Sequence, residues 1–153
     1  MSSSAQYYTL TALAAIPELS QELAQAFPLP AQYRTGIYEL LINAMEHGTL
    51  GIGFAAKTDL IRSGKWREEV DRRLALPENI GKKVTTRLAV SPGECRLTIT
   101  DPGQGFPWRD YLAQPGFGKR PNGRGLLIAF HSGFDEIFFN TTGNAVTCVA
   151  RRA

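Results

Sequence analysis

The first half of the chain carries the hydrophobic spacing of helices. Within residues 32–47, apolar side chains recur at the three- and four-residue spacing of an amphipathic helix: Ile37, Leu40, Leu41 and Ala44. Gly48 directly follows this run and is a typical helix terminator. An earlier helix begins at Pro17, which suits a first helical turn, and Pro28 and Pro30 stop it. The pattern therefore predicts two helices before residue 49.

Polar and apolar residues alternate with a period of two in other parts of the chain. Val84, Thr86, Leu88 and Val90 alternate before the turn sequence SPGE, and Leu97 and Ile99 continue after it. A second pair of strand-like runs, 134–140 and 145–150, flanks TTGN. Residues 6–12 are rich in aromatic and β-branched side chains. We expect one early strand and two hairpins.

Residues 49–83 follow neither period clearly. Trp66, Val70 and Leu74 recur every four residues among many charges, which predicts a short helix over 66–75. Residues 101–123 are rich in glycine and proline and are expected to form a loop, followed by a short helix over 125–131.

This order of elements predicts an α+β fold. Helices and strands are partly segregated along the chain, which favours a two-layer sandwich with helices on one face of a mostly antiparallel, mixed sheet. No internal repeat or linker divides the sequence, so residues 1–153 are expected to form a single domain with an insert at about 49–83.

Composition narrows the class of protein. Of 153 residues, 43% are hydrophobic and 20% are charged, with a net charge of +3, which is typical of a soluble globular domain and gives no support to nucleic-acid or membrane binding. No secretory leader or long apolar run is visible, so we expect a cytoplasmic protein. Cys95 and Cys148 are expected to be buried thiols.

The predicted helix over 32–47 carries a row of polar residues. Glu39, Asn43 and His47 are four residues apart and share one side of the helix. Taken alone, such a row favours an ordinary solvated polar face, because every surface helix has a polar side. As chemistry, Glu39 can accept a proton, and the Asn43 carboxamide oxygen suits a hard cation such as Mg²⁺. For His47, a local hydrogen bond at the helix end is favoured over a chemical role.

A glycine-rich turn follows the strand LTIT. Asp101-Pro-Gly103-Gln-Gly105 reads as a tight turn if taken alone. However, a carboxylate at a strand end can accept hydrogen bonds from an exocyclic amine such as that of adenine. Gly103 and Gly105 would let the backbone approach a flat ring.

A third candidate segment precedes the predicted helix over 125–131. Gly123-Arg124-Gly125 would leave free backbone N–H groups facing a phosphate, although a lone pair of glycines is weak evidence. Lys119, Arg120 and Arg124 can neutralise phosphate charge, or they can be ordinary surface residues.

Together these segments resemble the three motifs of one ATPase superfamily. Residues 39–48, ELLINAMEHG, look like the N box of the GHKL (Bergerat-fold) ATPases. Asp101-Pro-Gly103-Gln-Gly105 resembles their G1 box, and Gly123-Arg124-Gly125 resembles their G2 box, in the family's order. Within the superfamily, the chain is most similar to anti-sigma-factor serine kinases and related histidine-kinase-like domains.

The resemblance implies a function and its residues. It implies ATP and Mg²⁺ as cofactors, with Asn43 on the metal, Asp101 on the adenine amine, and Glu39 as the base that deprotonates a substrate serine. ATP would be held further by Gly103, Gly105, Lys119, Arg120, Gly123, Arg124 and Gly125. It implies an anti-anti-sigma (STAS-type) protein as substrate, a sigma factor as second partner, and commonly a homodimer.

Two departures from the family keep other functions open. Gly143-Asn-Ala-Val146 stands where the family often has a threonine-bearing segment, and the insert at 49–83 is longer than a minimal anti-sigma kinase needs. A binding module that holds ATP without transferring phosphate is the main alternative. The remaining alternative is a set of coincidental turns that bind no nucleotide.

Overall fold

The computed structural model describes residues 4–52, 54–105, 108–109 and 128–152. Its strands are β1 (Ser4–Leu10), β2 (Val84–Val90), β3 (Glu94–Thr100), β4 (Glu136–Phe139) and β5 (Ala145–Arg151). Its helices are α1 (Ile16–Ala24), α2 (Pro30–Asn43), α3 (Phe54–Ser63) and α4 (Trp66–Leu74), with a 3-10 turn η1 (Leu13–Ala15) and a π-helix η2 (Ala44–Thr49). Among these residues, no helix is long and apolar enough to cross a membrane.

The strands form one sheet in the order β1-β2-β3-β5-β4. All four described pairings are antiparallel, and Leu97 of β3 is aligned with both Leu88 of β2 and Cys148 of β5. The fold is therefore α+β, as expected, but the described sheet is not mixed. Both predicted hairpins are confirmed, because tight turns join period-two runs in each.

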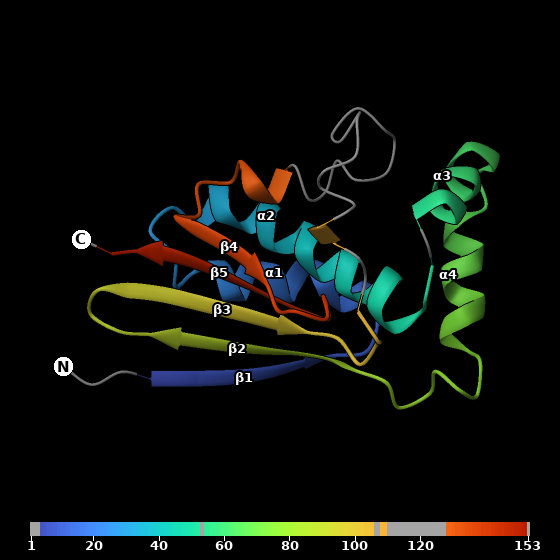
Figure 1. Cartoon of the computed structure of the whole chain (residues 1–153), viewed down its shortest axis with the longest axis horizontal. Helices are drawn as coiled ribbons and strands as arrows, with labels where there is room; N and C mark the ends of the chain where they lie inside the picture. Colours follow the sequence, from blue (N-terminus) through green and yellow to red (C-terminus); the bar gives the residue numbers. More distant parts are fainter. Residues whose placement is uncertain (1–3, 53, 106–107, 110–127, 153) are drawn as a thin grey trace.

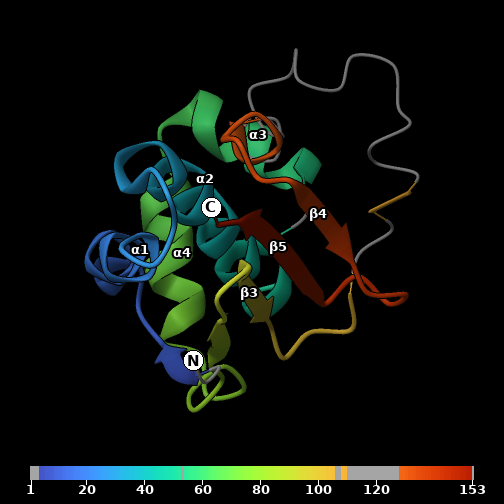
Figure 2. The ribbon, with the colours of Figure 1, turned by 90° about the vertical axis from the view of Figure 1, so that its left-hand side faces the viewer.

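The helices α1 and α2 cover one face of this sheet (Figures 1 and 2). Along β3, alternate residues are buried, and Cys95, Leu97 and Ile99 point into the core. They meet the apolar stripe of α2, in which Ile37 and Leu41 are fully buried. Cys95 and Cys148 are both buried free thiols, as predicted.

Segment 49–83 is mostly helical. Helix α4 matches the helix predicted over 66–75, whereas α3 was not predicted. The two helices lie beyond the end of the sheet, next to the C-terminal end of α2 (Figure 1). Val70 of α4 is fully buried, so the insert packs onto the core.

The helix that carries the polar row continues beyond its expected end at His47. Its last turn, Ala44–Thr49, is a π-helix closed by a hydrogen bond from Leu50 N–H to the Met45 carbonyl at 3.0 Å. Gly48 therefore lies inside this turn and does not end the helix. Of the helix predicted over 125–131, the structure describes residues 128–131: residues 128–130 are helical, and His131 lies in a turn.

Candidate functional site

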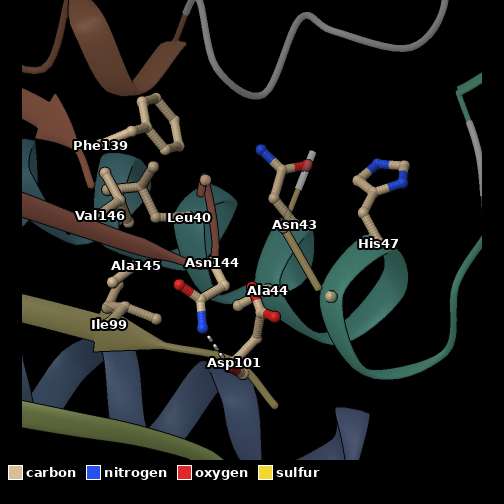
Figure 3. A pocket seen from close by; sticks show the side chains of 13 residues that line it. Leu40, Asn43, Ala44, His47, Ile99, Asp101, Phe139, Asn144, Ala145 and Val146 are labelled. Carbon is tan, nitrogen blue, oxygen red and sulfur yellow. Dashed lines mark hydrogen bonds between the residues drawn. The ribbon is translucent and has the colours of Figure 1, made fainter. Parts of the chain in front are cut away.

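A pocket lies where β3 ends and β5 begins, beneath α2 and η2. We call it the Asp101 pocket; its apolar walls come from Leu40, Ala44, Ile99, Phe139 and Val146. Asn43, His47, Asp101 and Asn144 supply its polar groups (Figure 3). The volume that a water-sized sphere can reach inside it is about 40 Å³. An apolar hollow with a few convergent polar groups is typical of a small-molecule site.

Asp101 occupies the floor of this pocket because it directly follows the last residue of β3. Its N–H donates to the Asn144 carbonyl at 2.9 Å, which ties it to the start of β5, and the Gly103 N–H donates to its Oδ1 at 2.8 Å. Burial raises the pKa of the Asp101 carboxyl to about 6, although the Gly103 N–H counteracts this. No cation pairs with this carboxyl within the described residues.

Glycines make this arrangement possible. A methyl group at Gly48 would overlap the Asp101 carboxyl carbon, so the π-helix can approach the carboxylate only without a side chain there. A methyl group at Gly105 would overlap the Thr142 carbonyl oxygen, and the φ of Gly105 is 89°, which favours glycine. The Asp101 loop is thus packed between η2 and the turn before β5.

Asn43 and His47 rise from the helix on the other side of the pocket (Figure 3). The Asn43 Nδ2 is buried and has no hydrogen-bond partner among the described residues. Such a buried, unpaired amide is costly unless a ligand completes it. The His47 Nδ1 hydrogen-bonds to the Ile52 carbonyl, and burial lowers the pKa of His47 to about 4, so its ring is neutral at pH 7. This local bond is the role that the sequence favoured for His47.

Glu39 lines a different hollow from Asn43. We call it the Lys57 groove; it lies between α2 and the α3–α4 insert and is lined by Tyr38, Glu39, Glu46, Lys57, Ile61 and Trp66, among others. Each four-residue step along an α-helix turns by about 40°. Glu39 and Asn43 therefore stay neighbours, but Glu39 groups with Ile42 and Glu46 rather than with His47.

Glu46 is the functional candidate that the sequence reasoning missed. Its side chain is fully buried, and Lys57 Nζ lies 2.6 Å from its Oε2. Burial raises the pKa of Glu46, and the Lys57 ammonium counteracts this. Burial also raises the pKa of Glu39, again against the effect of Lys57. The seven-residue spacing of Glu39 and Glu46 on one helix was the available signal; nothing in the sequence pointed to Lys57.

The predicted site is therefore assembled in part. Asn43, Asp101 and Gly105 line one pocket, and Gly103 supports it through its N–H. Glu39 lies outside this pocket as its described residues define it. Lys119, Arg120, Gly123, Arg124 and Gly125 lie outside the described residues. Asn144, which the sequence did not single out, lines the pocket, and its Nδ2 donates to the Asp101 carbonyl at 3.4 Å.

Comparison with known proteins adds no family to this geometry. No protein-family model matches the chain, and no curated protein matches it.

Proposed function

We propose that this chain binds Mg-ATP and acts as a serine-protein kinase of the anti-sigma-factor type, on a Bergerat fold. The observation that carries the proposal is the pocket that Asn43 and Asp101 share: among the described residues, the Asn43 Nδ2 has no hydrogen-bond partner and the Asp101 carboxyl has no cation paired with it. The three segments that resemble the N, G1 and G2 boxes indicate the GHKL superfamily. The Asp101 pocket supports the proposal of nucleotide binding.

The adenine base suits the inner end of the Asp101 pocket. Its exocyclic amine would donate to the Asp101 carboxylate, which is an acceptor only when ionised. Leu40, Ile99 and Val146 supply apolar surface for the two faces of the ring. A guanine would turn its carbonyl oxygen toward the same carboxylate, so the site should prefer ATP to GTP.

The triphosphate would run from this pocket past Asn43. The Asn43 carboxamide oxygen is the kind of hard ligand that Mg²⁺ takes while keeping several waters. When bound, the metal would neutralise charge on the phosphates. Lys119, Arg120 and Arg124, and the backbone of Gly123 and Gly125, are the proposed phosphate contacts.

Glu39 would remove the proton from the acceptor serine. It lies one helical turn before Asn43 and faces the Lys57 groove. The serine oxygen must reach both Glu39 and the γ-phosphorus, so the triphosphate would extend past Asn43 to the edge of α2 that carries Glu39, and ADP would leave on the opposite side of the phosphorus. The proposed acceptor is a STAS-type anti-anti-sigma protein, and the proposed second partner is a sigma factor.

The first test is phosphoryl transfer by wild type and by Glu39→Ala. Radiolabelled ATP and purified STAS-type proteins should give labelled serine with wild type, and Glu39→Ala should lose about 100-fold or more of the rate. Because Glu39 lies outside the Asp101 pocket, the variant should keep its ATP-induced thermal shift, worth about 2.7 kcal/mol at 100 times the Kd. Equal rates in the two proteins would remove Glu39 from the mechanism.

Two observations favour a second function, a non-catalytic ATP-binding module for partner switching. Glu39 and Asn43 line separate hollows. Gly143, just before β5, and Ala145, its first residue, line the Asp101 pocket without a hydroxyl for a nucleotide contact. A module would show the thermal shift with Mg-ATP but no labelled serine with any STAS-type protein.

A further inference from the structure

The insert places one lysine against the helix that carries Glu39. Lys57 lies on α3, and its ammonium pairs with the Glu46 carboxylate at the end of that helix, with 16% and 0% of the two side chains exposed. The Trp66 ring centroid lies 5.9 Å from the same Nζ. A long, flexible lysine side chain is thus fixed between a buried carboxylate and an aromatic ring.

Glu39 borders two hollows, and their charged groups differ in exposure. The Lys57 groove brings Glu46, Lys57 and Arg67 near Glu39, and the hollow toward α1 brings Glu18 and Arg34. Glu18, Arg34 and Arg67 are exposed, and Arg67 is also paired with Asp71 at 3.6 Å. Exposed charges are screened by water. Lys57 is therefore the largely buried cation that faces Glu39 within the described residues.

We infer that Lys57 is a positioning residue for Glu39: its ammonium, fixed by the buried Glu46 carboxylate in the groove that Glu39 also lines, favours the charged form of Glu39 that can accept a proton. This inference rests on the proposed role of Glu39 as the base. It also assigns a task to the insert, which is to carry a cation to the proposed catalytic helix.

The physical reason is the competition between burial and charge. A half-buried carboxyl group tends to hold its proton, and a protonated Glu39 cannot act as a base. The charge of Lys57 lowers the pKa of Glu39, opposite to the effect of burial. Glu46 alone would add a second negative charge near Glu39, so the ammonium is needed to offset both carboxylates. If the Lys57–Glu46 ion pair only held α3 in place, removing it would not change the titration of Glu39.

The test is a carbon-13 NMR titration of the Glu39 carboxyl in the full chain, without nucleotide or acceptor. The Glu39 signal is assigned by its loss in Glu39→Gln. In Lys57→Met the titration midpoint should rise by about one pH unit, a tenfold change in proton affinity, and Lys57→Arg should restore most of it. Lys65→Met removes the same charge from an exposed position beside α4 and should leave the midpoint unchanged.

A second comparison covers the case in which Lys57→Met fails to fold with Glu46 unpaired. Glu46→Gln is compared with Glu46→Gln/Lys57→Met, so that no buried carboxylate loses its partner between the two proteins. In the double variant, Glu39 should titrate at a higher pH than in Glu46→Gln. The inference is wrong if removing Lys57 shifts the Glu39 titration midpoint no more than Lys65→Met does, in whichever pair of proteins folds. The titration of Glu39 does not depend on whether the protein transfers phosphate, so the inference about Lys57 and the proposed kinase activity can fail separately.

Discussion

The Asp101 pocket and the Lys57 groove lie on two sides of α2, and both hold partly or fully buried carboxyl groups. In the groove, the insert supplies Lys57 to Glu46 at 2.6 Å. In the pocket, Asp101 has no cationic partner and Asn43 Nδ2 has no hydrogen-bond partner among the described residues. The two hollows therefore differ in charge pairing: the buried Glu46 carboxylate has a cation beside it, which joins the insert to α2, whereas no described cation pairs with Asp101. Buried polar atoms without a hydrogen-bond partner among the described residues occur in both hollows.

The largest effect on the Asp101 pocket is expected from Gly48→Ala. Helix propensity alone predicts that Gly48→Ala gains stability. The added methyl group would instead overlap the Asp101 carboxyl carbon, so we expect a loss of about 1–3 kcal/mol in the free energy of unfolding. ATP affinity should fall by about 100-fold, because the carboxylate must move. Urea unfolding and calorimetric titration measure the two effects.

The control for this substitution is Gly93→Ala. A methyl group at Gly93, in the β2–β3 turn, would meet nothing within 4 Å. It should leave ATP binding unchanged. A Gly48→Ala protein that binds ATP like wild type would show that the contact between η2 and Asp101 does not shape the pocket.

The next largest effect is expected from Asp101→Asn. The variant keeps an oxygen for the Gly103 N–H but loses the charged acceptor proposed for the adenine amine. A hydrogen bond to a charged group contributes about 1.5–3 kcal/mol, so ATP affinity should fall by about 10- to 100-fold. Asp59→Asn, at an exposed position on α3, is the matched control. The preference for ATP over GTP should also shrink; an unchanged ratio would argue against the adenine contact.

The smallest effect is expected in the pH dependence of stability. The pKa of Asp101 is about 6 in the fold and about 3.8 in a free chain, so the native protein holds this proton to higher pH. The unfolded chain loses this proton first, so the free energy of unfolding falls as pH rises from about 3.8 to about 6 and changes little above that. Relative to wild type, Asp101→Asn should gain about 1 kcal/mol between about pH 3.5 and 6.5, after allowance for solvent screening. A constant difference across this range would mean that Asp101 titrates normally.

Local patterns predicted much of this fold because they reflect local physics. The alternation over Val84–Val90 specified a strand, and the SPGE turn specified its hairpin partner. In α4, the four-residue spacing of Trp66, Val70 and Leu74 predicted a helix, although most residues between them are charged. In contrast, α3 has no clear apolar stripe, so its helix depends on contacts with the rest of the chain, which the sequence pattern does not display.

The site was harder to predict, because its geometry depends on turns of the helix and on distant segments. The spacing of Glu39, Asn43 and His47 placed them on one side, but their successive 40° rotations separate Glu39 from His47. The role of Gly48 is set by Asp101, which is 53 residues away in the sequence. Likewise, the partner of Glu46 comes from another helix. Such pairings are tertiary and leave no periodic signal.

The wide turn of η2 makes the site sensitive to chain length as well as to side chains. A π-helix accommodates one more residue per turn than the α-helix before it. Deleting a single residue from Ala44–Thr49 would favour ordinary α-helical winding and would rotate everything after the deletion by about 100°. Gly48 would then turn away from Asp101, and the insert would leave α2 in another direction. A one-residue deletion here is thus expected to be more damaging than most substitutions of the same residues.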